Sequence, residues 1–437
     1  MKNLVVADVS VLLPDMEIRN HQTVEAADGK IIKIRPFQQE DRKEDRKDWI
    51  DGRGKLLMPG LADCHMHTGQ QLLKGKILDE LPMIWTRIML PFESTLTEQK
   101  MELSAKLAAL EMIKSGTTAF IDAGSYYMEA AAEVYVKSGL RGVLSASTMD
   151  EKGLPESIAQ TAQEAIAQTD RLYDYYHGKG NLKAAYSLRS LLSCSKELIV
   201  KAAERAKERN TLLQAHMNEY PNEINGYLQR EQKRPMEYLE SLGVLGENFV
   251  SAHSILLSEN EKDIAARNDI KICHCPFSNC GKGVPDTPAL LQRNVCVGLG
   301  TDGAAHGGLS LWNEMKIFRS VMNTAWGVPN QNPAIMPAKE IIRMATEQGY
   351  HLMHEDGGKI EVGKKADFIT ISLCQPHLYP SGNLVNTLLE CVTAADVCDS
   401  VVEGKILMKD RKVQTLDEMA ILSEARDFME RQEREVC

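Results

Sequence analysis

Eight apolar, strand-like runs alternate with segments of helical period through the middle of this 437-residue chain. The runs are Leu57–Asp63, Thr117–Ala123, Arg141–Thr148, Leu182–Leu188, Thr211–Ala215, Asn248–Ala252, Ile270–Ile272 and Val295–Gly300. Continuous apolar runs separated by helices are typical of parallel strands that are buried on both faces. Eight of them predict an α/β fold, a closed (β/α)8 barrel of the TIM type.

The helical segments between these runs have recognisable ends. Thr97 is expected to cap one helix, and the residues from Ser258 to Glu261 have the pattern of a capping box. Pro337 is expected in the first turn of a helix that stops at Gly349.

Both ends of the chain read as short strands joined by turns. Neither residues 1–57 nor residues 363–415 are long enough to close a sheet alone, so we expect the two pieces to form one small β-sandwich domain. Residues 58–362 then form the barrel. The charged, amphipathic residues 416–437 are expected to form a C-terminal helix, packed on the surface or on a sister subunit.

Charge and cysteine usage exclude several classes of protein. With 51 Lys and Arg against 61 Asp and Glu, the net charge of −10 disfavours binding to nucleic acid. No run approaches the roughly 18 uncharged apolar residues of a membrane span, and Asp8 and Asp15 interrupt the apolar stretch that a signal peptide needs. Several of the ten cysteines lie inside apolar runs, where reduced thiols act as small core residues. We therefore expect a cytoplasmic protein.

Polar residues follow four of the predicted strands at the end where barrel enzymes carry their active sites. They are His65 and His67 after the first run, His216 with Glu219 after the fifth, His253 after the sixth and Asp302 after the eighth. Each alone is more often an ordinary polar residue than a ligand, but their coincidence at one end of one barrel favours a shared site.

Three of these imidazoles and one carboxylate form a ligand set for a single cation. His65 and His67 share one face of a strand, and His216 and Asp302 complete the set. Such nitrogen-rich sites suit Zn²⁺, with Fe²⁺ and Mn²⁺ as alternatives, and leave a position for water. A bound cation lowers the pKa of that water from about 15.7 toward 7, which is what a hydrolase requires.

The order and spacing of the motifs carry a resemblance to a known family. The motifs are Met58-Pro59-Gly60-Leu61 before His65-x-His67, Gly116-Thr117-Thr118, His216-x-x-Glu219, Ala252-His253, His274-Cys275-Pro276 with Ser278-Asn279, Gly300-Thr301-Asp302-Gly303, and Gly363-Lys364-Lys365-Ala366-Asp367. Over most of its length the chain resembles the amidohydrolase superfamily, in the branch of cytosine, guanine and S-adenosylhomocysteine deaminases and triazine hydrolases.

The resemblance implies a role for each of these residues. It implies metal ligation by His65, His67, His216 and Asp302, with Glu219 as proton shuttle and His253 beside the attacking water. The chemistry of deamination agrees, because a ring nitrogen and the leaving amine must both be protonated, and one carboxyl group can move both protons. Asp302 can take the proton of the water, and His253 can hydrogen-bond the developing oxyanion. Two-metal relatives use a bridging lysine near the fourth strand, where this chain has Arg189, so one divalent metal is expected.

The resemblance also suggests residues that contact the substrate. Arg189 opens a segment similar to one in guanine deaminases in which the arginine contacts the purine, although Ser190 replaces the aromatic residue there. Trp85 and Glu93 resemble a segment of S-adenosylhomocysteine and methylthioadenosine deaminases whose glutamate binds ribose hydroxyls. A structural ion pair for Arg189 and a surface position for Glu93 are the alternatives.

Two further residues complete the set of substrate-binding candidates. Gln70, three residues beyond His67, could offer its amide to a heteroaromatic edge, or could face solvent. His306 follows Asp302 where family members commonly have small residues, so it is expected to reshape the pocket, whereas Trp312 is expected to be core.

These expectations define a function and its alternatives. We expect a mononuclear metal-dependent deaminase that releases ammonia from a purine-type ring, such as an adenosine-like nucleoside, S-adenosylhomocysteine, methylthioadenosine or guanine. Pterin, pyrimidine or triazine aminohydrolases, triazine chlorohydrolases and cyclic amide hydrolases are alternatives on the same scaffold. A non-catalytic scaffold is disfavoured because every proposed ligand and Glu219 are present. The partner is a small molecule, and the resemblance implies a homodimer.

Overall fold

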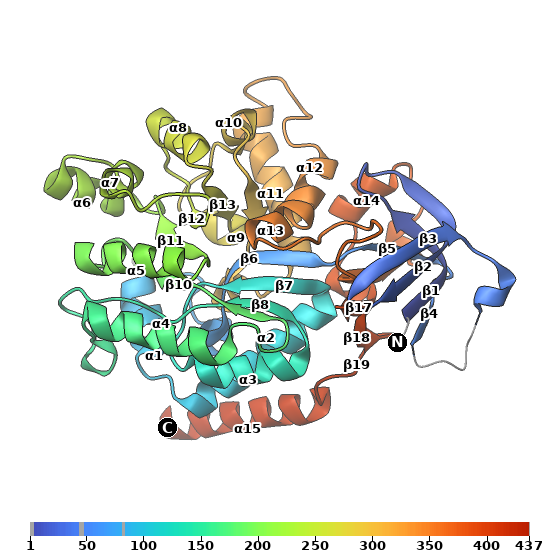
Figure 1. Ribbon diagram of the computed structural model, residues 1–437, viewed down its shortest axis with the longest axis horizontal. Helices are drawn as coiled ribbons and strands as arrows, with labels where there is room; N and C mark the ends of the chain where they lie inside the picture. Colours follow the sequence, from blue (N-terminus) through green and yellow to red (C-terminus); the bar gives the residue numbers. More distant parts are fainter. Residues whose placement is uncertain (1–3, 43–47, 81–83, 437) are drawn as a thin grey trace.

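The computed structural model describes residues 4–42, 48–80 and 84–436, the last five by their backbone only. This part of the chain forms a large α/β barrel with a smaller β-domain beside it (Figure 1).

Short parallel strands form the wall of the barrel. They are β6 (Leu61–His67), β7 (Thr117–Asp122), β8 (Arg141–Leu144), β9 (Leu182–Ala184), β10 (Tyr186–Leu188), β11 (Leu213–Met217), β12 (Phe249–His253), β13 (Lys271–His274), β14 (Val297–Leu299) and β15 (Asp302–Gly303). Hydrogen bonds join them into two arcs, β15-β6-β7-β8-β9 and β10-β11-β12-β13-β14. Only Ala185 separates β9 from β10, and only Gly300 and Thr301 separate β14 from β15, so the chain itself joins the arcs into a ring of eight. The predicted (β/α)8 barrel is confirmed.

The first predicted run, Leu57–Asp63, is divided between two sheets. The chain passes at Gly60 from β5 (Lys55–Pro59) of the β-domain to β6 of the barrel. A Cβ on Gly60 would lie 2.0 Å from Oγ1 of Thr118, so the crossing requires a residue without a side chain. The prediction of one continuous strand was wrong, because an apolar run does not reveal where a chain changes its pairing partner.

Helices surround the barrel. They are α1 (Leu90–Glu93), α2 (Glu98–Ser115), α3 (Met128–Ser138), α4 (Ala162–Tyr176), α5 (Lys196–Glu208), α6 (Pro221–Glu231), α7 (Pro235–Leu242), α8 (Glu259–Arg267), α9 (Pro276–Asn279), α10 (Thr287–Gln292), α11 (Leu311–Met322), α12 (Ala338–Met344) and α13 (Glu347–Leu352). The caps at Thr97 and Ser258 are confirmed. The single helix predicted from Pro337 to Gly349 was wrong: Pro337 caps α12, and Gly349 lies inside α13.

Both ends of the chain contribute to one mixed sheet, as predicted. Its strands are β1 (Leu4–Leu12), β2 (Ile18–Ala27), β3 (Lys30–Pro36), β4 (Trp49–Asp51), β5, β16 (Phe368–Ser372), β17 (Val397–Val402), β18 (Lys405–Lys409) and β19 (Lys412–Val413). Strand β16 pairs antiparallel with β5 and thereby joins the two ends. The sheet curls until the turn between β2 and β3 meets the segment before β16, where Ile31 N donates to the Lys364 carbonyl at 2.9 Å. The domain boundaries at residues 57, 363 and 415 stay predictions.

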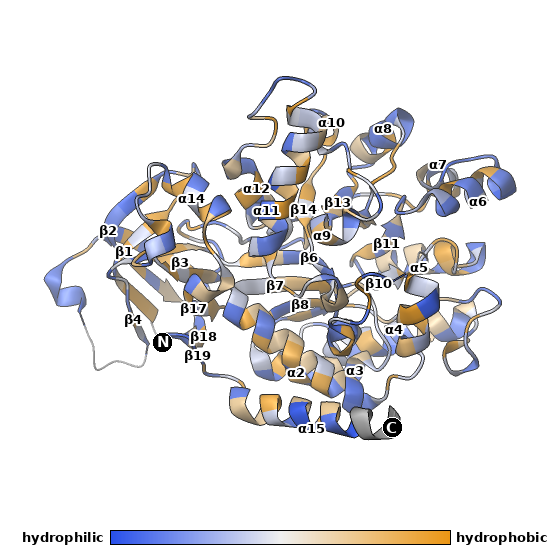
Figure 2. Cartoon of the chain, turned by 180° about the vertical axis from the view of Figure 1, so that it is seen from behind, coloured by the Kyte–Doolittle hydropathy of each residue, from blue (hydrophilic) through white to orange (hydrophobic). Residues whose placement is uncertain are grey.

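The last helix, α15 (Glu418–Val436), lies along α2 on the outside of the barrel (Figures 1 and 2). Ion pairs join the two helices, from Lys106 Nζ to Glu424 Oε2 at 2.9 Å and from Lys114 Nζ to Glu418 Oε1 at 2.6 Å. The predicted amphipathic C-terminal helix is thus present, and in Figure 2 it shows both hydrophobic and hydrophilic colours. The remaining helix, α14 (Leu384–Glu390), precedes β17.

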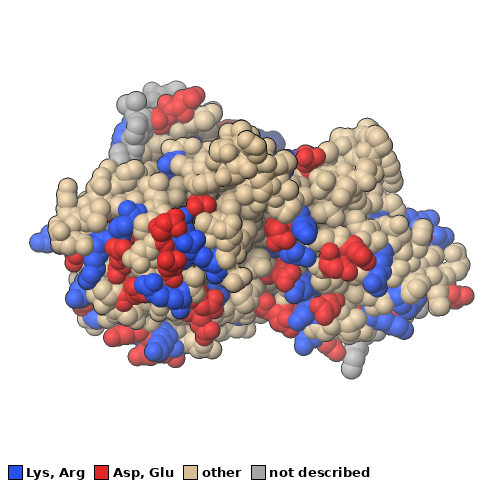
Figure 3. Space-filling view, turned by 90° about the horizontal axis from the view of Figure 1, so that it is seen from above, with Lys and Arg blue, Asp and Glu red and all other residues tan. Residues whose placement is uncertain are grey.

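The surface matches the charge balance of the sequence. On the face shown in Figure 3, basic and acidic side chains are interspersed rather than gathered by sign. Among the helices of the described residues, none combines the length and the apolar character that a membrane span needs.

Candidate active site

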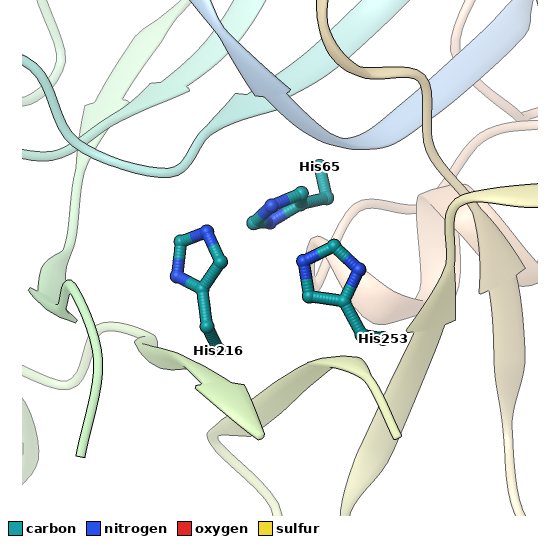
Figure 4. Close-up of side chains that lie close together, drawn as sticks. All are labelled: His65, His216 and His253. Atoms are coloured by element: carbon teal, nitrogen blue, oxygen red, sulfur yellow. The ribbon is translucent and has the colours of Figure 1, made fainter. Parts of the chain in front are cut away.

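Four histidines and an aspartate meet at the carboxyl end of the barrel strands. They are His65 and His67 in β6, His216 in β11, His253 at the end of β12 and Asp302 at the start of β15. In the parallel ladder His216 pairs with Ala252, and the next residue pairs with His253, so neighbouring strands carry the two imidazoles to the same level. Figure 4 shows the rings of His65, His216 and His253 facing one another, with centroids 4.7 to 5.3 Å apart.

Backbone geometry turns two of these side chains out of their strands. His253 has φ = 65° and Asp302 has φ = 59°, both in the left-handed region that non-glycine residues rarely adopt. Such conformations cost on the order of 1–3 kcal/mol and persist where the surrounding structure enforces them, typically at functional sites.

The donor atoms of these residues form overlapping groups in which all atoms lie within 4.8 Å of one another: His65 with His216 and His253, and His65 with His67 and Asp302. His67 Nε2 lies 3.1 Å from His216 Nε2 and 3.4 Å from Asp302 Oδ1, and His65 Nε2 lies 3.9 Å from the same oxygen. Both ring nitrogens of His65 and Nε2 of His253 have no hydrogen-bond partner, although they are buried. Buried nitrogens that have no hydrogen-bond partner and lie beside a carboxylate are typical of a metal-binding site, because their ligand atoms point toward the ion rather than toward other protein groups.

Burial sets the protonation of the imidazoles. It lowers the pKa of His65 to about 3, and it lowers the pKa values of His67 and His216 well below their usual range, so all three are neutral near pH 7. Neutral imidazole is the form that binds a metal ion. His253 differs: burial lowers its pKa, but the nearby Glu219 carboxylate and Cys275 outweigh burial and raise it to about 9.

Glu219 lies between two cationic groups. Its Oε1 is 2.5 Å from Lys282 Nζ and 3.7 Å from His253 Nε2. Burial raises the pKa of Glu219, but the charges of His253 and Lys282 outweigh burial and lower it. The lowered pKa makes Glu219 an ionised carboxylate at the edge of the histidine cluster.

Asp302 is held by a short chain of hydrogen bonds that sequence reasoning missed. Ser278 Oγ donates to Asp302 Oδ2 at 2.6 Å, and Lys282 Nζ donates to Ser278 Oγ at 2.7 Å. Lys282 thus links the two carboxylates of the site. The signal that the sequence offered was the position of Lys282 shortly after the Ser278-Asn279 motif, in the segment that follows a barrel strand.

Three of the predicted substrate-binding residues form one buried network. Glu93 Oε1 accepts a hydrogen bond from Gln70 Nε2 and pairs with Arg189 Nη2, both at 2.8 Å. Arg189 Nη1 lies 2.8 Å from His67 Nδ1, so the network reaches the histidine cluster. The surface position considered for Glu93 was wrong, because only 6 % of this residue is exposed. Gly303 makes room for Gln70, since a Cβ there would lie 1.6 Å from its Oε1.

A cavity of about 240 Å³ opens above the cluster. Gln70, Trp85, Arg189 and His306 line it, as do His67, His216, Glu219, His253 and Asp302, so most of the predicted site faces one space. Sequence reasoning missed Met89, Leu192, Tyr220 and Glu223, which also line it. Trp312 is fully buried and donates its indole N–H to the Ser115 carbonyl, which confirms it as core.

A (β/α)8 barrel with imidazoles and carboxylates converging at its carboxyl mouth defines the class of barrel hydrolases with a metal-competent centre. Within that class, this chain belongs to the amidohydrolase family, whose model matches residues 56–407. The family resemblance inferred from the sequence motifs is thereby confirmed.

Comparison with known proteins shows which members it resembles. It is 35 % identical over 396 residues to a 5′-deoxyadenosine deaminase of Methanobrevibacter smithii, covering 87 % of each chain. It is 33 % identical over 386 residues to a 5-methylthioadenosine/S-adenosylhomocysteine deaminase of Thermoanaerobacter pseudethanolicus, covering 86 % of each. Its fold matches the crystal structure of an adenosine deaminase of Xanthomonas campestris with bound zinc, with a TM-score of 0.90, 23 % identity and 98 % coverage of both chains.

Proposed function

We propose that the protein is a hydrolytic deaminase of adenine nucleosides modified at the 5′ position. We propose further that it depends on one divalent metal ion, with Zn²⁺ as the first candidate. The observation that carries the proposal is the clustering of four imidazoles, Asp302 and Glu219 at the mouth of the barrel, where all of them except His65 line one cavity. The deaminase names of relatives above 30 % identity support the reaction and the purine-type substrate.

The residues present fit a divalent cation. Buried imidazole nitrogens of His65 without a hydrogen-bond partner lie beside an ionised carboxylate, and the neighbouring imidazoles are neutral. We propose His65, His67, His216 and Asp302 as the residues that hold the metal. When bound, a divalent cation supplies Lewis acidity that makes water a nucleophile near neutral pH.

The remaining steps are assigned to the chain's own groups. The attacking water gives up two protons, one to a ring nitrogen and one to the departing amine. Asp302 is placed to accept a proton of this water, and Glu219, ionised and at the edge of the cavity, is placed to deliver the two protons one after the other. His253 Nε2, which has no hydrogen-bond partner among the described residues, is placed to donate a hydrogen bond to the oxyanion that develops at the attacked carbon.

The network around Glu93 is assigned to substrate positioning. The carboxyl oxygens of Glu93 can accept hydrogen bonds from sugar hydroxyls. Glu93 is not itself a lining residue of the cavity, but Arg189 and Gln70, which fix its orientation, both line it. Trp85 offers an aromatic face and His306 a polar edge on the cavity wall.

Ammonia release tests the proposal. Purified, metal-loaded protein should release one ammonia per 5′-deoxyadenosine or 5′-methylthioadenosine, with a product about one dalton heavier than the substrate. Glu219→Gln should lower kcat by about 10²–10⁴-fold and keep the metal. No ammonia from these nucleosides, together with release from a guanine, pterin, pyrimidine or triazine compound, would assign the site to one of the alternatives.

We also propose a homodimer that works in the cytoplasm. The dimer rests on the family resemblance, and light scattering of the purified protein measures it directly. The cytoplasmic location is supported by the cysteines of the described residues, which are all free thiols.

A further inference from the structure

The charged side chains that line the cavity already have partners. Arg189 pairs with Glu93, and Lys282 pairs with Glu219 and donates to Ser278. A substrate group that carried its own charge would have to break one of these pairs or remain unpaired.

The lining residues Trp85, Met89, Leu192 and Tyr220 form a separate feature, which we name the apolar wall. Trp85 and Met89 lie in the helical turn η3 (Trp85–Met89) and pack together with Leu73, Ile77 and Ala305. Leu192 is 40 % exposed and Tyr220 is 36 % exposed, so both offer apolar surface for a ligand to cover.

We propose that the apolar wall binds the 5′ substituent of the nucleoside and selects an uncharged one, a hydrogen, methyl or alkylthio group, over a substituent that ends in an amino acid. This inference rests on the proposed function. Once the network of Glu93, with its cavity-lining partners Arg189 and Gln70, receives the sugar and Glu219 faces the ring, the 5′ carbon is directed toward the remaining lining surface. The four side chains of the wall carry no charge of their own. The nearest described ammonium group, that of Lys282, lies 5.3 Å from the centre of the Tyr220 ring and is already paired with Glu219, so it is not free to pair with a carboxylate. Burying such a group unpaired is unfavourable, whereas an alkyl group covers apolar surface.

Three substrates that differ only at the 5′ position test the inference. The value of kcat/KM for 5′-deoxyadenosine and 5′-methylthioadenosine should exceed that for S-adenosylhomocysteine by on the order of 100-fold. Equilibrium binding to the Glu219→Gln variant should show the same order of affinities, which separates recognition from chemistry. Comparable values for S-adenosylhomocysteine would overturn the inference and leave the proposed function standing. No ammonia from any of the three would overturn both.

A gain-of-function variant makes the test sharper. Leu192→Arg places a cation on the wall at a position exposed enough to accept it, and should raise kcat/KM for S-adenosylhomocysteine relative to 5′-deoxyadenosine by about 10-fold, because the guanidinium can pair with the carboxylate. Leu192→Gln, similar in size but uncharged, is the matched control and should give no such gain. An equal gain in both variants, or in neither, would overturn the assignment of the wall to the 5′ substituent.

Discussion

The buried carboxylate of Glu223 holds the backbone of Glu219. Its Oε2 accepts the Glu219 N–H and its Oε1 accepts the Asn218 N–H, each at 3.0 Å. Asn218 has φ = 49°, so this segment between β11 and α6 is in a conformation that needs support. Glu223 therefore fixes the segment that presents the proposed proton shuttle.

Glu223→Ala is expected to lower kcat by about 10–100-fold with a smaller change in KM, since a misplaced catalytic group costs rate more than binding. Steady-state kinetics with 5′-deoxyadenosine measure both constants. Glu223→Gln keeps the size and one acceptor oxygen and should fall between the wild type and Glu223→Ala. A variant whose kcat is unchanged while its thermal stability drops would make Glu223 a purely structural residue.

Lys282 gives a second prediction about the same carboxylate. Lys282→Met removes the ammonium group between Glu219 and Ser278 but retains much of the side-chain volume, so Glu219 loses its closest partner. We expect kcat to fall by about 10–100-fold, with metal content retained. Lys282→Arg should recover part of the loss because it restores the charge. Full activity in Lys282→Met would show that Glu219 does not need this partner.

Metal content tests the proposed ligands. Elemental analysis should find one divalent ion per chain, and His216→Ala should lose most of it, because a buried ligand is removed from the cluster. Removal of the metal with a chelator should lower the unfolding temperature, since a ligand that binds only the folded state stabilises it. His351→Ala, an exposed histidine outside the cluster, is the control and should bind metal as the wild type does. Equal metal content in the two variants would reject His216 as a ligand.

How much of the molecule was predictable depends on whether a feature is local. The i, i+2 spacing of His65 and His67 is a property of one strand, so their common direction followed from the sequence. The pairing of Arg189 with Glu93 was not predictable, because the two residues come from segments that only the closed barrel brings together. Lys282 was missed for the same reason, because its role in the site depends on its ion pair with Glu219, which follows a different strand.

The fold shows the same distinction. Apolar runs predicted the barrel strands because consecutive apolar residues place apolar side chains on both faces of a strand, as a strand buried on both faces requires. The division of the first run at Gly60 depends on pairing with β16, more than 300 residues later, which the run itself does not encode. The helix break after Met344 is not marked by a glycine or a proline, so no local signal of this kind predicts it.

Glu355, just after α13, gives a prediction about pH and stability. Its carboxylate pairs with Lys183 at 2.6 Å and with Lys365 at 3.2 Å, and Arg141 lies 3.7 Å away. Burial raises the pKa of Glu355, but these cations outweigh burial and lower it. A lowered carboxyl pKa stabilises the fold above the unfolded-state pKa of about 4.3, and this contribution is lost as the pH falls through the folded-state pKa.

The free energy of unfolding, measured with urea at several pH values, should therefore be lower for Glu355→Gln than for the wild type at pH 7, by about 1–3 kcal/mol. The difference should shrink as the pH falls below about 4, because the wild type then loses the same charge. Glu197→Gln, which changes an exposed ion pair with Lys201, is the control and should alter the free energy of unfolding by less than about 1 kcal/mol at either pH. A difference between Glu355→Gln and the wild type that stays constant down to pH 3 would mean that the pairing with Lys183 does not lower the pKa of this carboxyl.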